Sequence, residues 1–128
     1  MKIFFVINSL LLTILVLPSA SFAGWRKVSE SMDGSVFYVD PSTIKKSGSS
    51  IYFWQLNDYA EPDDRGEMSS KIYKQLECFL NQYQSLKYAS YQLSMGQGAA
   101  KVWTAHDQSW KSVDPEDIMS DVAEFVCR

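Results

Sequence analysis

The chain has 128 residues, of which 12 are Lys or Arg and 15 are Asp or Glu, giving a formal charge of −3. An acidic chain without basic clusters is poorly suited to nucleic acid or to anionic membrane surfaces, because both are bound mainly through Lys and Arg. The length is enough for one domain with a single modest core.

Residues 1–23 have the layout of a secretory signal peptide. A positive residue near the start is followed by an apolar stretch and then by small side chains. The apolar stretch is shorter than the roughly 20 residues that a membrane-spanning helix needs. Cleavage after Ala23 would remove one lysine and release a domain over residues 24–128 with a formal charge of −4, no longer inserted in a membrane. Because residue 24 is glycine and not cysteine, we expect no lipid anchor there.

The first part of the released domain is predicted to be a β-hairpin. Residues 25–41, WRKVSESMDGSVFYVDP, read as two short strands joined at Asp33-Gly34, since this dipeptide suits tight turns. Asp40-Pro41 predicts a second turn, and residues 45–50 are predicted to be a polar connection.

The middle of the chain is predicted to be strands separated by one polar loop. Residues 50–59, SIYFWQLNDY, are rich in aromatic and branched residues, and residues 71–80 alternate between apolar and polar. In residues 83–95 the alternation changes parity, which predicts a β-bulge near Ala89-Ser90. A further strand is expected around Val102.

The C-terminal stretch, VDPEDIMSDVAEFVCR, is predicted to be the one helix. Asp114 can cap it and Pro115 suits the first helical position. One apolar stripe follows, formed by Met119, Val122, Ala123, Val126 and Cys127. Strands first and a helix last predict an α+β fold, an antiparallel β-sheet with a C-terminal α-helix packed on one face.

Cys78 and Cys127 are the only cysteines. In an exported chain they are most simply a disulfide, which here would link the helix to the sheet. A metal site or a redox pair is less well supported, because there is no C-x-x-C motif and His106 is the only histidine.

No motif in the sequence predicts catalytic, cofactor-binding or metal-binding residues. Gly96-x-Gly98 lacks the strand and helix of a dinucleotide site, and the acidic loop at 61–67 lacks the spacing of a calcium loop. His106 has no nucleophile motif to serve. We therefore expect no enzymatic activity and no cofactor.

The aromatic residues are the feature that most suggests binding. Four tryptophans and seven tyrosines exceed what one small core requires. Aromatic side chains are enriched where proteins bind other molecules. A helix covers one face of an antiparallel sheet, so we expect a few aromatic residues to be exposed on the other face.

The order and spacing of several segments resemble the surface-adhesin protein E family of Gram-negative bacteria. The segments are YVDPSTIKKSG, IYFWQLNDY, SSKIYKQLEC, YASYQLSMGQG and SWKSVDPEDIMSDVAEFVC, and they span almost the whole of residues 24–128. The resemblance implies an antiparallel sheet with a C-terminal helix joined through Cys78 and Cys127. It also implies a non-enzymatic adhesin that attaches to host extracellular-matrix proteins and can form a homodimer.

The family adhesin resembles a lipoprotein, whereas Gly24 offers no lipid acceptor. The expected function is therefore an exported protein-binding domain located in the periplasm, secreted or held at the cell surface without lipid. The alternative is a periplasmic accessory or inhibitor protein with the same fold and no role in adhesion.

Overall fold

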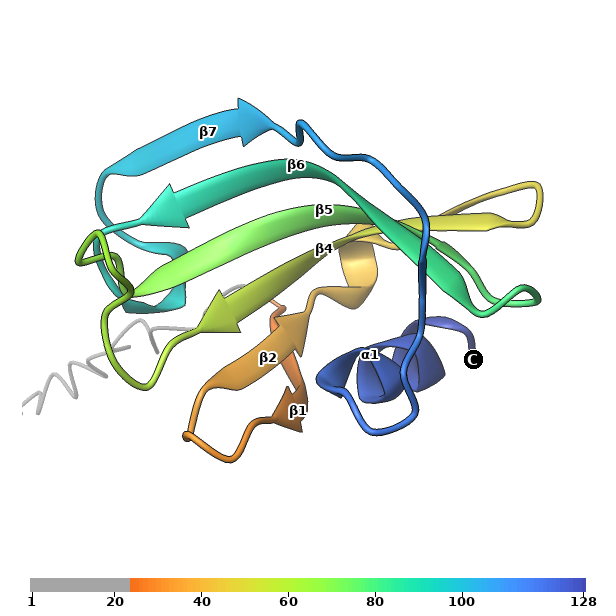
Figure 1. Ribbon diagram of the computed structural model, residues 1–128, viewed down its shortest axis with the longest axis horizontal. Helices are drawn as coiled ribbons and strands as arrows, with labels where there is room; N and C mark the ends of the chain where they lie inside the picture. Colours follow the sequence, from red (N-terminus) through yellow and green to blue (C-terminus); the bar gives the residue numbers. More distant parts are fainter. Residues whose placement is uncertain (1–23) are drawn as a thin grey trace, which may run out of the picture.

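The computed structural model of the protein describes residues 24–128; the signal peptide expected at 1–23 lies outside the described residues. Residues 24–128 form an eight-stranded antiparallel sheet and one α-helix, α1 (Ile118–Val126) (Figure 1). The strands are β1 (Arg26–Glu30), β2 (Val36–Val39), β3 (Lys45–Ser47), β4 (Ser50–Asp58), β5 (Ser69–Glu77), β6 (Gln82–Tyr91), β7 (Ala100–Thr104) and β8 (Lys111–Ser112).

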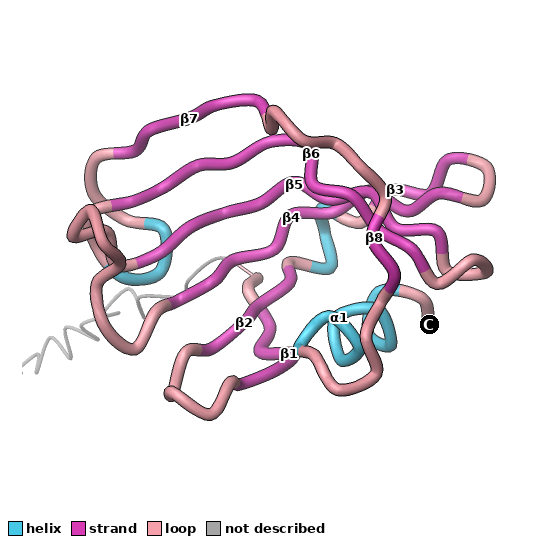
Figure 2. Tube along the Cα trace, in the orientation of Figure 1, coloured by secondary structure: helices cyan, strands magenta, loops and turns pink. Residues whose placement is uncertain are grey.

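The main path of the sheet is β1-β2-β4-β5-β6-β7, while β3 pairs with β4 and β8 pairs with β6 (Figure 2). β3 is an addition to the expectation, because its stretch was predicted to be a polar connection. It forms instead a tight hairpin with β4 in which Ser47 pairs with Ser50 and Gly48 has a φ of 59°. The polar composition predicted the turn correctly, but the pairing of three exposed residues depends on the neighbouring strand β4.

The sheet has two different faces, because side chains alternate along each strand. The inner face carries Ile51 and Phe53 of β4 and Leu76 of β5, which pack against α1 in the main core. From the helix, the core receives Met119, Val122, Ala123 and Val126. This is the apolar stripe predicted from the sequence, and the predicted α+β fold is confirmed.

The helix begins later than the sequence predicted. Asp117 is the N-cap, and its carboxylate accepts a hydrogen bond of 2.6 Å from the Ile118 N–H. Asp114 organises the preceding turn instead, since its carboxylate accepts from the Glu116 N–H at 2.9 Å and its carbonyl accepts from the Asp117 N–H at 3.1 Å. Asp114 and Asp117 are both suitable N-cap residues, and in the structure Asp117 is the one that caps the helix.

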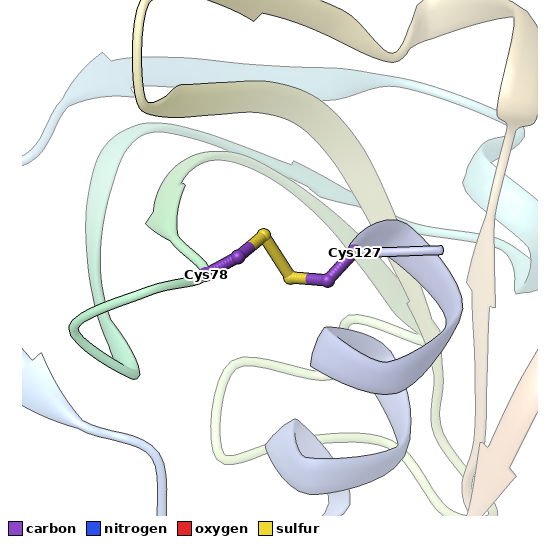
Figure 3. The surroundings of a disulfide bond; sticks show 2 residues. All are labelled: Cys78 and Cys127. Atoms are coloured by element: carbon purple, nitrogen blue, oxygen red, sulfur yellow. A yellow bond between two sulfur atoms is a disulfide. The ribbon is translucent and has the colours of Figure 1, made fainter.

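Cys78, directly after β5, and Cys127, directly after α1, form a disulfide with a Cα–Cα distance of 5.8 Å (Figure 3). The link joins the end of the helix to the sheet, as predicted. Cys127 was expected on the buried helix face but is exposed, because it is the C-cap residue and lies beyond the last buried turn.

The bulge predicted near Ala89-Ser90 is absent, because β6 pairs continuously with β5 from Lys87 to Tyr91; β6 has a bulge earlier in the strand instead. Tyr73 pairs with Lys87 and Lys74 pairs with Ser85, which leaves Leu86 as the additional residue. The bulge reverses the parity of β6, so that Tyr83 and Tyr88 both face the inner side. The position of a bulge depends on how the strand pairs with its neighbour, and the alternation within one strand does not reveal that pairing.

Candidate protein-binding surface

The outer face of the sheet, away from α1, carries rows of side chains that run across the strands. One row is Trp54, Tyr73 and Lys87, which are directly opposite one another on β4, β5 and β6. The neighbouring row contains Lys45 of β3 and Tyr52 of β4. Continuous pairing of four strands therefore places three aromatic rings side by side between two lysines.

We define the aromatic patch as Tyr52, Trp54 and Tyr73. The ring centroids of Trp54 and Tyr73 are 5.1 Å apart, and those of Tyr52 and Tyr73 are 6.1 Å apart. Such separations are favourable for aromatic pairs, and Tyr73 is the neighbour of both other rings. All three side chains are half-buried, so the rings pack on one another and still present surface to solvent. The sequence predicted aromatic side chains on the face opposite the helix, and these three residues lie there.

Trp54 lies at a gap in the sheet. On the side of β4 away from β5, β2 ends at Val39 and β3 begins at Lys45, and a 3₁₀ turn (Pro41–Thr43) connects them. The Trp54 N–H, which has no strand partner on that side, donates to the Thr43 hydroxyl at 3.3 Å. The turn, the rings and the two lysines enclose a shallow depression of about 370 Å³ lined by Ser42, Thr43, Lys45, Trp54, Tyr73 and Lys87.

The hydroxyl groups around the depression already have partners. The Ser42 hydroxyl donates to the Asp40 carboxylate at 2.7 Å, and the Thr43 hydroxyl donates to the Asp40 carbonyl at 2.7 Å. The turn is thus held rigidly by Asp40, which also caps it. The ammonium groups of Lys45 and Lys87 remain the polar groups available to a ligand in the lining.

A ladder of amide side chains borders the aromatic patch on the outer face. Gln84 Nε2 donates to Gln75 Oε1 at 2.6 Å, and Gln75 Nε2 donates to Ser50 Oγ at 2.8 Å. The Ser50 hydroxyl in turn donates to the Glu77 carboxylate. These bonds fix the residues beside Tyr52, so the patch rests on a well-supported surface.

The opposite end of the outer face is covered. A 3₁₀ turn (Ser94–Gly96) lies on it, with the Met95 N–H donating to Asp58 Oδ1 and the Gly96 N–H donating to Ser69 Oγ, at 2.9 and 2.8 Å. Leu56 is fully buried beneath this turn although it shares a face with Trp54. The covering turn closes this end of the outer face, where Tyr38 and Tyr91 also lie half-buried, and it leaves the patch uncovered at the other end.

Gly96 has a structural role in this covering turn. Its φ is 69°, and a side chain at this position would approach Lys71 Cε to 2.6 Å. The Gly96-x-Gly98 segment is thus a tight turn packed on the sheet.

The remaining tryptophans are dispersed over the molecule. Trp103 stacks on Tyr88 on the inner face at 5.7 Å, with the Arg65 guanidinium over its ring at the same distance, and Trp25 lies 5.6 Å from Lys71 Nζ. Trp110 is 42% exposed and does not line the depression. None of these places more than two aromatic rings together among residues 24–128.

The most strongly perturbed ionisable group lies on the inner face, where sequence reasoning did not look for one. Lys74 is 5% exposed, and its ammonium donates to Gln55 Oε1 at 2.9 Å and to Met119 Sδ at 3.0 Å. Burial lowers the pKa of Lys74 to about 7, with the attraction of Asp117 opposing that shift. The signal was present in the sequence, because position 74 is in phase with Leu76.

The residues that the sequence analysis considered for a catalytic or metal-binding site do not lie together. His106 is exposed on the connection after β7, and Asp63 of the acidic loop accepts from the N–H groups of Arg65 and Glu67 at 2.9 Å each. Within residues 24–128 no three His, Cys, Asp or Glu side chains are grouped as ligands for a metal ion. Over the same residues, the single α-helix lacks the length and apolar character needed to cross a membrane.

Comparison with known families decides the identity of the domain: residues 25–128 match the model of surface-adhesin protein E. The chain belongs to the surface-adhesin protein E family. The resemblance stated from the sequence is thereby confirmed over nearly all of the described residues.

Solved structures of Haemophilus influenzae protein E have the same fold as this family member. Crystal form II is 18% identical, with 82% of this chain and 87% of that chain covered and a TM-score of 0.61. Protein E from non-typeable Haemophilus influenzae is 19% identical, with 86% and 79% covered and a TM-score of 0.61. No curated protein matches the chain significantly. At these identities the structural likeness concerns the fold alone.

Proposed function

We propose that this protein E family member is an exported, non-enzymatic adhesin that recognises another protein through the aromatic patch. The observation that carries the proposal is the open outer face, where Tyr52, Trp54 and Tyr73 are grouped on a rigid sheet. Tyrosine and tryptophan dominate the binding energy of protein interfaces, because they bury a large area at low entropic cost. Membership of an adhesin family supports a protein partner for this surface, and we propose an extracellular-matrix protein of a host.

The proposal is tested by the binding of the purified protein to a panel of immobilised extracellular-matrix proteins. Trp54→Ala should weaken the binding by at least about tenfold, since tryptophan is enriched among the interface residues whose truncation costs about 2 kcal/mol or more. Trp110→Ala is the matched control, because Trp110 is partly exposed and lies outside the patch. Equal binding by the Trp54 variant and the wild type, or binding by neither to any matrix protein, would contradict the proposal.

A further inference from the structure

The aromatic patch has a charge opposite to that of the domain that carries it. The domain over residues 24–128 is acidic, yet among the described residues that line the depression the charged ones are Lys45 and Lys87 and none is acidic. The two lysines lie on opposite sides of the rings, because Lys45 is opposite Tyr52 and Lys87 is opposite Tyr73 in the sheet. The surface therefore has aromatic rings at its centre and a positive charge on either side of them.

Both lysines are available to a ligand. Both side chains are exposed, and the ion pairs formed within residues 24–128, Lys27 with Glu30 and Arg128 with Glu124, include neither. Lys87 Nζ lies 5.8 Å from the centre of the Tyr73 ring, a cation–π contact that orients the ammonium beside the patch without neutralising it. An anionic group placed there would find an oriented, unpaired cation.

The combination favours a particular ligand chemistry. Polyanions such as nucleic acids or sulfated polysaccharides are bound by dense clusters of cations that neutralise closely spaced charges. Two lysines separated by three aromatic rings instead match carboxylates separated by apolar side chains. Acidic polypeptide segments have this alternation, whereas sulfated polysaccharides carry closely spaced anionic groups.

From these observations we infer that the aromatic patch binds an acidic polypeptide segment of the partner protein, with Lys45 and Lys87 contacting carboxylates on either side of the rings. This inference rests on the proposed function, because it names the chemistry of the partner at the same surface. Electrostatic complementarity of this kind contributes to the association rate and to partner choice, while the rings contribute buried area.

The test measures the binding of a short fluorescein-labelled peptide of alternating glutamate and tyrosine by fluorescence anisotropy. The competitors are a lysine–tyrosine peptide of the same length and heparin. The full exported protein is compared with Lys45→Glu/Lys87→Glu and with the control Lys46→Glu/Lys101→Glu. The control carries the same charge change, and its residues are exposed but alternate to the other face of β3 and β7.

The expected result is that the glutamate–tyrosine peptide binds, that Lys45→Glu/Lys87→Glu weakens the binding about tenfold or more, and that the control stays within about twofold of wild type. Equal effects of the two double variants, or absence of binding to the wild type, would overturn the inference. Preferential binding of heparin would also overturn it, in favour of a polysaccharide.

Failure of this inference is distinguishable from failure of the proposed function. If Trp54→Ala abolishes binding to a matrix protein while Lys45→Glu/Lys87→Glu leaves it intact, the patch is the binding surface and its partner segment is not acidic. If neither variant affects that binding, the patch is not the binding surface and both proposals are wrong.

Discussion

Lys74 shows how a single residue departs from what its type predicts. Lysine is almost never fully buried without a charged partner, and here the nearest partners of the ammonium are the neutral Gln55 and Met119. Desolvation disfavours the charged form, which lowers the pKa of Lys74 to about 7. The fold thus includes a group whose charge is costly at neutral pH.

The sign of the resulting pH dependence follows from proton linkage. In the unfolded chain the lysine pKa is about 10.4, so between pH 7 and that value the unfolded state binds more protons than the folded state. Stability rises with pH wherever this holds, so raising the pH from about 7 to 9 should increase the free energy of unfolding by roughly 2 kcal/mol. Thermal unfolding across this range measures the effect.

Lys74→Met isolates the contribution of Lys74. Methionine retains the length of the side chain and removes the charge, so the variant should be more stable than wild type at pH about 7 and should lose most of the rise toward pH 9. A wild-type melting temperature that falls over this range, or an equal rise in both proteins, would show that Lys74 does not control the pH dependence.

The sequence contained part of this information at the residue scale. Alternation along residues 50–59 puts Tyr52 and Trp54 on one face, because side-chain direction in a strand has a period of two. It also placed Lys74 in phase with Leu76, on the buried face. The burial was not predicted, since lysine is ordinarily exposed, and the polar and sulfur groups that receive its ammonium come from β4 and α1.

At the scale of elements, the boundaries of α1 depend on which carboxylate caps it. Asp117 accepts from the Ile118 N–H, and its charge lies at the positive end of the helix. The sequence predicted the helix and its buried stripe but assigned the cap to Asp114. Local sequence does not decide between two Asp residues of similar capping strength; packing of Met119 and Val122 against the sheet fixes the first turn.

The capping role of Asp117 gives a stability prediction. Asp117→Ala should lower the free energy of unfolding by about 1 kcal/mol, whereas Asp117→Asn should lower it much less, because asparagine caps about as well. Urea denaturation of both variants at neutral pH makes the comparison. Equal losses would mean that the negative charge near Lys74, and not the hydrogen bond to Ile118, is what stabilises the fold.

The disulfide is the second device that holds α1 on the sheet. It spans a sequence separation of 49 residues, and closing a loop of this size is worth about 4 kcal/mol in the chain-entropy model. Small domains have total stabilities of about 5–15 kcal/mol. On this model the disulfide accounts for a large part of the stability of the domain.

Reduction should lower the melting temperature by roughly 10 °C or more, because 1 kcal/mol corresponds to about 4–8 °C in a domain of this size. Calorimetry with and without reductant gives the measurement, and Cys78→Ser/Cys127→Ser, which does not respond to reductant, is the control. Unchanged unfolding of the wild type after complete reduction would show that core packing alone holds the helix.

For the whole molecule, one face of the sheet forms the core with the helix, and part of the other face is available to bind a partner. On the inner face α1 packs against the core, and on the outer face the turn at Ser94–Gly96 covers one end and leaves the aromatic patch uncovered at the other. The overall class could be predicted from the order of strands and helix. The gap between β2 and β3 beside Trp54, and the two lysines flanking the rings, arise from strand register and could not be predicted.

An adhesin must be reachable from outside the cell, so the central claim is tested most directly by protease accessibility in bacteria that express the protein. Arg65 lies in an exposed loop between β4 and β5. Both cysteines lie after Arg65, so the disulfide does not link the two fragments that cleavage there produces. Arg65→Gln removes this site and is the control, and an intact periplasmic marker reports on the outer membrane. Our proposal predicts that trypsin cleaves the wild type at Arg65 in intact cells; protection until the outer membrane is opened would place the protein in the periplasm and contradict adhesion.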